Sequence, residues 1–466
     1  MRKLHLIAAV ALPVWLAGCA TPAPPAAIAT TAPPQWYGPL PHNGTLGDLT
    51  RWWQQFDDPL LVQLIESAQT LSPTIATARS RIVQARASRA AARAALLPTL
   101  DAQASASRGN SQPPLPLATT LQAGLQAGWE ADLFGANRDT ARAAQSKLDA
   151  AHAGWHDARV SVAAETAVSY LNLRTCARQL DVATRDASSR AATSRLAGLT
   201  ARAGFTAPAG AALAQASAAE GSARATQQRA QCDIDVKALV ALSGVPEPQL
   251  RAHLARPWQE PSQAVLLPLV SLPAAVLAQR PDVYQAEREV AAASAEIGAA
   301  QAQRYPRLTL TGTLAVGTVR VGGANTEAQT WAIGPLTVTV PLFDGGRRAA
   351  NVEAARARYD EAAALYTARV RQAVRDVEEA LVNLESARLR MEDARTAAEG
   401  FKLSFTATEA RYRSGLGSLV ELEDARRIAL AAETALVDLR RERVAAWIAL
   451  YRALGGGWAR PDAPSA

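Results

Sequence analysis

The sequence has few aromatic residues, which make up 5% of its 466 positions, although 49% of its residues are hydrophobic. Much of that apolar content is alanine, which favours helices and lets them approach closely. We therefore expect long, closely packed helices and not a thick globular core. After Cys19 no run of 18 consecutive apolar residues occurs, so the mature sequence predicts no transmembrane helix.

Signals for chemistry are also lacking. No nucleophile motif, phosphate loop or dinucleotide fingerprint occurs, and we expect neither an enzyme nor a cofactor. The net charge of +7 comes from scattered arginines, without the basic and aromatic runs that bind nucleic acid. His152 and His156 are four residues apart on a predicted helix, but no third ligand is near, so no metal site is predicted.

Residues 1–18 have the pattern of a bacterial lipoprotein signal peptide. Arg2 and Lys3 give a positive start, the apolar run Leu4–Leu16 follows, and the segment ends at Cys19. The residues before Cys19, Leu-Ala-Gly, match a lipobox, which predicts cleavage before this cysteine and lipid attachment to it. The alternative is an ordinary secretory signal with a chance cysteine.

The residue after the predicted lipid site is Ala20 and not aspartate, which in lipoproteins of this kind implies sorting to the outer membrane. Residues 19–50 are rich in proline and small side chains. We interpret them as a lipidated tether and not as a folded domain.

After the tether, segments with the hydrophobic spacing of helices alternate with segments that have the spacing of strands. A helix is predicted over 74–97, and residues about 99–107 and 120–133 alternate as strands of a hairpin. A helical run of about 68 residues, roughly 100 Å long, extends from there to Gly204. A return helix is predicted from 209 to 242.

The same pattern occurs twice. Pro73 and Pro281 are 208 positions apart, and Gly204 and Gly415 are 211 apart. The predicted boundaries are a first structural repeat at 51–244, a Pro-rich crossover at 245–272, a second repeat at 273–455 and a tail at 456–466. In the second repeat we expect strands at about 307–319 and 331–342, a long helix at 346–413 and a return helix at 417–453.

Four strands cannot close a sheet on themselves, and a strand edge cannot remain free in lipid. Several chains would have to pool their strands, and three chains would give twelve, a number that suits a membrane β-barrel. We therefore predict an α+β membrane protein built from a duplicated helix, β-hairpin, long helix, helix unit.

At this point the sequence resembles the TolC/OprM outer-membrane factor family, specifically the NodT-type efflux lipoproteins. One departure is Ser72-Pro73, where the family often has Asn-Pro. The motifs that carry the resemblance, in chain order, are Trp52–Leu60, Trp129–Gly135, Gln279–Val283, Tyr305–Leu308, Pro341–Gly346 and Arg411–Gly415.

The resemblance implies a homotrimer with a 12-stranded β-barrel in the cell outer membrane, continued by a 12-helix periplasmic coiled-coil barrel. Such a channel is the passive exit duct of a tripartite efflux pump for drugs or other small molecules. Its partners would be a periplasmic adaptor (membrane fusion protein), an inner-membrane pump and outer-membrane lipid. The alternatives are a duct for protein or peptide secretion and a periplasmic coiled-coil adaptor without a pore.

The resemblance also assigns a periplasmic gate. Glu421 and Asp424 match the ring acids of the family, although glutamate replaces the usual acid at 421, and Tyr412 and Arg413 match its tethering positions. Independently, residues 421 and 424 share one helix face, so threefold symmetry would place six carboxylates around a pore. The alternative is a solvated acidic stripe that neighbouring arginines balance.

The remaining cysteines are Cys176 and Cys232. The first helical hairpin turns near residues 204–206, and the two cysteines are almost equally distant from that turn. They should therefore face each other, and in an oxidising compartment we predict a disulfide. The alternative is two buried thiols in a seam of small residues.

Overall fold

The computed structural model describes residues 23–29, 36–38, 49–110, 117–256, 258, 280–458 and 460–461. The predicted signal peptide, the lipid site at Cys19 and most of the predicted crossover lie outside the described residues. The chain divides into two compact units. The first contains Ser80–Ala153 and Tyr284–Arg369, and the second contains Thr31–Arg79, Gly154–Val283 and Val370–Ala466. Each unit thus draws on both halves of the sequence.

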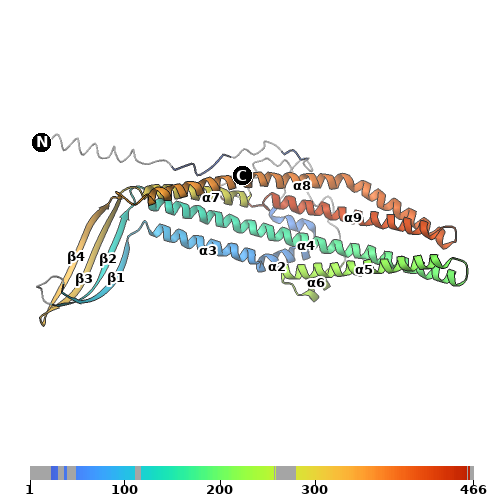
Figure 1. The fold of residues 1–466 in the computed structure, drawn as a ribbon, viewed down its shortest axis with the longest axis horizontal. Helices are drawn as coiled ribbons and strands as arrows, with labels where there is room; N and C mark the ends of the chain where they lie inside the picture. Colours follow the sequence, from blue (N-terminus) through green and yellow to red (C-terminus); the bar gives the residue numbers. More distant parts are fainter. Residues whose placement is uncertain are drawn as a thin grey trace. The chain divides into compact units, whose positions relative to one another are not determined.

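The first unit contains a four-stranded antiparallel sheet in the order β1-β2-β3-β4 (Figure 1). Strands β1 and β4 are therefore its edges. The strands are β1 (Thr99–Gly109), β2 (Ala118–Ala131), β3 (Arg307–Val321) and β4 (Ala324–Thr339).

The predicted strand bounds of the second hairpin, about 307–319 and 331–342, were wrong at its tip, because both strands extend further. Gly322 and Gly323 both have positive φ values, +56° and +92°. Two glycines in this conformation make a tight two-residue turn, so strand pairing continues to Val321 and Ala324. At its other end β4 stops at Thr339, before the predicted residue 342.

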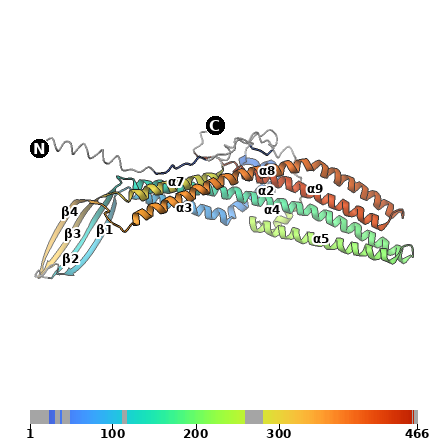
Figure 2. The same ribbon diagram turned by 45° about the horizontal axis from the view of Figure 1, so that its top comes forward.

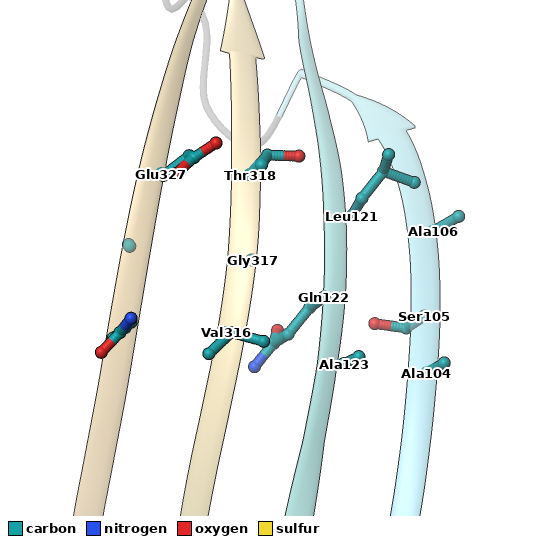
Figure 3. Close-up of a pocket in the computed structure, with 12 residues that line it drawn as sticks. Ala104, Ser105, Ala106, Leu121, Gln122, Ala123, Val316, Gly317, Thr318 and Glu327 are labelled. Carbon is teal, nitrogen blue, oxygen red and sulfur yellow. The ribbon is translucent and has the colours of Figure 1, made fainter.

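One face of the sheet is apolar and the other is polar. The register places Leu100 opposite Ala127, Leu125 opposite Leu314, and Leu314 opposite Trp331, all on one face. Gln122 and Leu121 leave β2 on opposite sides (Figure 3). This alternation is the pattern of strands that contact lipid on one face and water on the other.

A β-bulge keeps the apolar face continuous along β4. Leu310 pairs with Leu336 and Gly312 pairs with Ile333, so three steps on β4 match two on β3. Without the extra residue, Ile333 and Trp331 would turn to the polar face, because strand side chains alternate with a period of two.

The predicted helices are present, within three residues at each end. Among the described residues, every helix is too short or too polar to cross a lipid bilayer. Helices α4 and α8 each pass through both units. The helices that match predictions are α3 (Pro73–Ala94), α4 (Ala136–Arg202), α5 (Pro208–Ser243), α7 (Pro281–Ala302), α8 (Arg347–Arg413) and α9 (Leu419–Ala453).

Three short elements were not predicted: a 3-10 helix η2 (Leu49–Phe56), α2 (Pro59–Leu71) and α6 (Glu247–Leu254). Helix α2 begins where the Asp58 carboxylate accepts hydrogen bonds from two backbone N–H groups, with proline next at the first helical position. Helix α6 lies inside the predicted Pro-rich crossover, which is therefore not irregular throughout. Proline is tolerated in the first turn of a helix, so this composition does not exclude one.

The second unit has an aromatic core at η2. Trp52, Trp53 and Phe56 are all buried. Both tryptophans pack against Tyr451 of α9, with the rings of Trp52 and Tyr451 stacked at a centroid distance of 4.7 Å, and Phe56 packs against the two tryptophans. The Trp-Trp motif near residue 52 therefore has a structural role: it packs η2 against α9.

Candidate functional site

Two helical hairpins form most of the second unit. Figures 1 and 2 both show α5 beside α4 and α9 beside α8. Each hairpin turns at a glycine with positive φ, Gly204 at +77° and Gly415 at +74°. The next residue then donates its backbone N–H five residues back, Phe205 to Thr200 and Leu416 to Arg411, both at 2.9 Å. This is the Schellman arrangement, and it allows two long helices to reverse direction.

The two predicted cysteines face each other in the first hairpin. The Sγ atoms of Cys176 on α4 and Cys232 on α5 lie 2.08 Å apart as a disulfide, and the Cα atoms are 5.5 Å apart. In the second hairpin the corresponding seam is apolar, where Ala387 and Met391 of α8 pack against Leu439 of α9. Polar contacts accompany both seams: Gln228 donates to Gln179 at 3.1 Å in the first hairpin, and Arg390 pairs with Glu442 at 2.7 Å in the second.

The predicted ring acids lie exposed on α9 and do not contact each other. Glu421 belongs to a capping box, in which its backbone N–H donates to Ser418 Oγ at 3.1 Å and its carboxylate accepts from the Ser418 backbone. Asp424 is 63% exposed and pairs with Arg427 at 3.2 Å. Within one chain both acids therefore have local partners at the start of α9.

The predicted tethering residues lie on the last turn of α8. Arg413 pairs with Glu409 at 3.2 Å, four residues earlier on the same helix. Tyr412 is half-buried, and burial together with the negative charge of Glu423 raises the pKa of its phenol. The structure joins neither residue directly to Glu421 or Asp424.

Sequence reasoning missed a buried charge network that links the hairpins at their turn ends. We call it the hairpin joint. Glu423, one residue before the predicted ring acid Asp424, is its centre. The joint consists of Asp186, Ser189, Arg190 and Thr193 of α4, Ser217 of α5, Glu409 of α8, and Glu423 and Arg426 of α9.

One side of the Glu423 carboxylate holds α4 and α5. Arg190 donates from Nη1 to Glu423 Oε2 at 3.0 Å and to Ser217 Oγ at 2.6 Å. The Ser217 hydroxyl in turn donates to the same carboxylate oxygen at 2.8 Å. Arg190 is 6% exposed and also pairs with Asp186 at 2.8 Å, so two acids share it.

The other carboxylate oxygen of Glu423 pairs with Arg426, whose side chain is 2% exposed. Arg426 donates across to α4, to Thr193 Oγ1 at 2.9 Å and to Ser189 Oγ at 3.2 Å. Its guanidinium also lies 5.5 Å from the ring centre of Phe405 on α8. Burial lowers the pKa of this arginine, and the charge of Glu423 acts in the opposite direction.

The hairpin joint extends to one predicted tethering residue. The Ser189 hydroxyl donates to Glu409 Oε1 at 3.0 Å, the same oxygen that pairs with Arg413. Arg413 is therefore connected to α4 through Glu409, and not through the predicted ring acids.

Further polar contacts continue along α4 and α9. Gln179 donates to Asp438 at 2.7 Å, Arg185 to Glu433 at 2.7 Å, and Arg441 to Asn172 at 3.4 Å. Hydrogen bonds and ion pairs can be exchanged for water, whereas a disulfide or a dry apolar seam cannot. The boundary between the hairpins is thus better suited to reversible separation than the seam within either hairpin.

A glycine makes room for the joint. A Cβ atom on Gly221 of α5 would lie 2.7 Å from Cδ of Arg190 and 3.4 Å from Cα of Ala187. Only glycine lets α5 approach α4 closely enough here for Ser217, one turn earlier, to meet Arg190 and Glu423.

The sequence did contain a signal for this network. Leu422, Arg426 and Ala429 recur at the spacing of one helix face, and all three are buried. A charged residue inside an otherwise apolar stripe predicts a buried partner, because an unpaired buried charge is too costly. In the alternative to the gate, Arg426 is one of the arginines that balance a solvated acidic stripe, and its burial contradicts that part of the alternative.

The joint is a set of paired charges and hydrogen-bonded hydroxyls. Among the residues that the structure describes, no three histidine, cysteine or acidic side chains gather where they could hold a metal ion. What the joint can do is hold two rigid hairpins together or release them.

Comparisons with known proteins fit this architecture. A family model described as "Outer membrane efflux protein" matches residues 64–245 and 272–456. The pyoverdine export outer membrane protein OpmQ of Pseudomonas putida is 29% identical over 97% of this chain and 97% of its own length. The outer membrane protein OprJ of Pseudomonas aeruginosa is 30% identical over 89% of this chain and 88% of its own.

The fold has solved counterparts. The structure of the outer-membrane channel OprN superposes with a TM-score of 0.83 at 28% identity, covering 94% of this chain and 98% of that one. The similarity therefore extends over the sheet and the helices together, and is not confined to a single motif.

Proposed function

This chain belongs to the outer membrane efflux protein family, and from that premise we propose that it is the passive exit duct of a tripartite pump that exports drugs or other small molecules. It is an outer-membrane efflux channel protein, and the resemblance inferred from the motifs is confirmed. The observation that carries the proposal is the amphipathic sheet with two unpaired edges. Such a sheet needs further strands before it can reside in lipid.

We propose that three copies complete this sheet. The edge strand β4 of one copy would pair with β1 of the next, and twelve strands would then close around a polar lumen. The polar face of the sheet would line that lumen and the apolar face would contact lipid, as the alternation of Gln122 and Leu121 supports.

The hairpin ends would act as the gate. In a trimer, Glu421 and Asp424 of each copy would contribute to a ring of six carboxylates, which would favour cations at this constriction. Tyr412 and Arg413 would restrain the end of α8, the latter through Glu409. The hairpin joint would set how readily the α8/α9 hairpin moves away from α4.

A periplasmic adaptor and an inner-membrane pump would complete the exporter. Lipid attached at Cys19 would hold single chains at the outer membrane before the sheet closes. One lipidated residue gives only a membrane attachment, so the strands would supply the lasting hold.

The test is conductance of the purified full-length protein in planar lipid bilayers, together with its mass in detergent or nanodiscs. A trimer that conducts ions, and that restores drug export to cells lacking their own outer-membrane duct, is the expected result. A protein that stays monomeric and does not conduct would refute the channel. A conducting trimer that exports only protein substrates would instead support a secretion duct.

A further inference from the structure

Two arginines interrupt the apolar face of the sheet near its hairpin turns. The register places Arg108 of β1 opposite Thr119 of β2, and Thr119 opposite Arg320 of β3. Asn325 of β4 then follows opposite Arg320. Thr119 is two residues from Leu121, so all four side chains leave the sheet on its apolar face. We call these four residues the donor row, because each carries a hydroxyl, amide or guanidinium group that donates hydrogen bonds.

The two arginines of the donor row have no acidic partner among the described residues. Both are exposed, and neither forms a salt bridge with a described residue. One strand lies between them, so their Cα atoms are about 9.5 Å apart. The one acid on this face of the four strands is Glu327, which lies one row farther from the turns, opposite Thr318, and pairs with neither arginine. Residues 110–117, between the first two strands, include no charged residue.

The turn that follows Arg320 fixes its position. Gly322 and Gly323 connect β3 to β4 in two residues, and strand pairing continues to Val321 and Ala324. No loop therefore separates Arg320 from the end of the sheet. Because strand side chains alternate between two faces, this arginine cannot turn to the polar face without a shift of the whole register.

The spacing between the donor row and Trp129 fits the thickness of a membrane. Trp129 lies on the same face of β2 as Thr119, ten residues away, and its indole donates to the backbone carbonyl of Leu96 at 3.2 Å. Ten residues of strand span about 34 Å, and a tilt of about 35–45° reduces this to about 26 Å along the membrane normal. The apolar band of a membrane barrel is about 25 Å tall, with aromatic residues at its edges. With Trp129 at one edge, the donor row lies at the other.

The face between these two levels is uncharged on the central strands. On β2 it consists of Leu121, Ala123, Leu125 and Ala127. Charged side chains are costly in the middle of this band and are tolerated near its edges. The arginines thus lie at the depth of lipid headgroups, and their face is directed to lipid and not to the polar lumen.

We propose that the donor row binds the phosphate groups of glycolipids in the outer leaflet of the outer membrane. This inference rests on the proposed channel, in which the helices extend into the periplasm and the hairpin turns face the cell exterior (Figure 1). The ligand is a phosphorylated glucosamine lipid, the chemical class to which lipid A belongs. A guanidinium holds a phosphate through two parallel hydrogen bonds, and Thr119 and Asn325 supply further donors.

The proposed trimer would repeat the donor row three times. Six arginines would then surround the outside of the barrel at one level, with three carboxylates one row deeper. Such a ring attracts anionic headgroups from the surrounding leaflet and gains little from zwitterionic ones. The ring would act on the lipid around the channel, because it faces away from the path of exported molecules.

Native mass spectrometry of the full-length trimer in detergent tests the binding. The probe is lipid A with both of its phosphates, and the comparison is the same lipid with both phosphates removed. Arg108→Gln/Arg320→Gln should bind the phosphorylated probe about twenty-five-fold more weakly than the wild type, about fivefold for each arginine. The wild type should bind the phosphate-free lipid no better than this double variant binds the phosphorylated one.

Arg307 supplies a matched control on the same strand as Arg320. The two arginines are an odd number of residues apart, at opposite ends of β3, so Arg307 lies on the polar face. Arg307→Gln should bind the phosphorylated probe like the wild type, whereas Arg320→Gln alone should lose about fivefold. Arg108→Lys/Arg320→Lys should retain most of the binding, because the positive charge remains.

Two results would overturn the inference. One is equal binding of the phosphorylated probe by the double glutamine variant and the wild type. The other is equal binding of the phosphorylated and phosphate-free lipids by the wild type, a comparison that does not depend on the folding of any variant. A loss in Arg307→Gln as large as that in Arg320→Gln would likewise show that the donor row has no special role.

The outcome also separates this inference from the proposed function. A wild-type protein that is monomeric and does not conduct would defeat the channel and the donor row together. A conducting trimer that does not distinguish the two lipids would leave the channel standing and refute the lipid site alone.

Discussion

The hairpin joint makes a quantitative prediction for Glu423→Gln. This change removes the carboxylate that pairs with two buried arginines. Arg190 retains Asp186, but Arg426 keeps no paired carboxylate, only two hydroxyl groups and the ring of Phe405, and its side chain is 2% exposed. Removing one partner of a buried ion pair typically costs 3–5 kcal/mol, so we expect about 3 kcal/mol here because the geometry of Arg190 is preserved.

The effect on gating follows if the joint forms only while the hairpins are together. A loss of about 3 kcal/mol would shift the balance between closed and separated hairpins by about a hundredfold. The measurement is the conductance of the resting channel in planar bilayers, and the variant should leak strongly where the wild type is nearly closed. Circular dichroism would show whether the helices remain folded.

The neighbouring acid supplies the matched control. Asp424→Asn breaks a pair whose partners are 63% and 73% exposed, and such surface pairs contribute at most about 1 kcal/mol. The double variant Glu423→Gln/Arg426→Met removes both buried charges and should recover most of the closed state. If Glu423→Gln conducts like the wild type, or if Asp424→Asn leaks as strongly, the joint does not hold the hairpins together.

Three further changes test separate features. Gly221→Ala should lower stability by about 1–3 kcal/mol in thermal unfolding, because its Cβ would lie 2.7 Å from the α4 arginine of the joint, whereas Gly210→Ala meets open space and should be neutral or stabilising. Cys232→Ser should cost about 4 kcal/mol by the chain-entropy estimate, and a non-reducing peptide map that finds Cys176 free in exported wild-type protein would contradict the disulfide. Cys19→Ser behind an ordinary signal should abolish labelling by radioactive palmitate and slow trimer formation in a pulse-chase experiment, but a complete loss of trimers would mean that lipid is essential for assembly.

The long helices could be predicted because their signals are local. Pro73 marks the start of a helix, and Gly204 and Gly415 mark the two hairpin turns with the positive φ that glycine adopts readily. Hydrophobic residues that recur every 3.6 residues indicate a helix and those that recur every 2 residues indicate a strand, and neither pattern requires tertiary information. The facing of Cys176 and Cys232 follows from the turn position alone, since antiparallel helices pair residues at equal distances from the turn.

Features that depend on the partner segment could not be predicted in this way. Polar residues around Asn325 resemble a loop, yet they pair along β3 because two glycines close the turn behind them. The hairpin joint was missed for the same reason. Glu423 and Asp424 are adjacent acids, and the sequence next to them does not indicate which one is buried. Only the packing of α4 against α9 shows that it is Glu423. The partners of Glu423 on α4 and α5, Arg190 and Ser217, lie more than 200 positions away in the sequence.

Within the second unit, the contacts inside each hairpin differ in chemical type from the contacts between the hairpins. Within the first hairpin a disulfide joins Cys176 to Cys232, and within the second an apolar seam surrounds Met391. Between them lie charged and hydroxyl groups that water can replace once they part. A structure with strong seams inside two hairpins and exchangeable contacts between them can change by rigid movement of one hairpin against the other. Because Glu423 touches both arginines of the hairpin joint, the position of the α8/α9 hairpin should depend on this one carboxylate more than on any exposed acid near the turn.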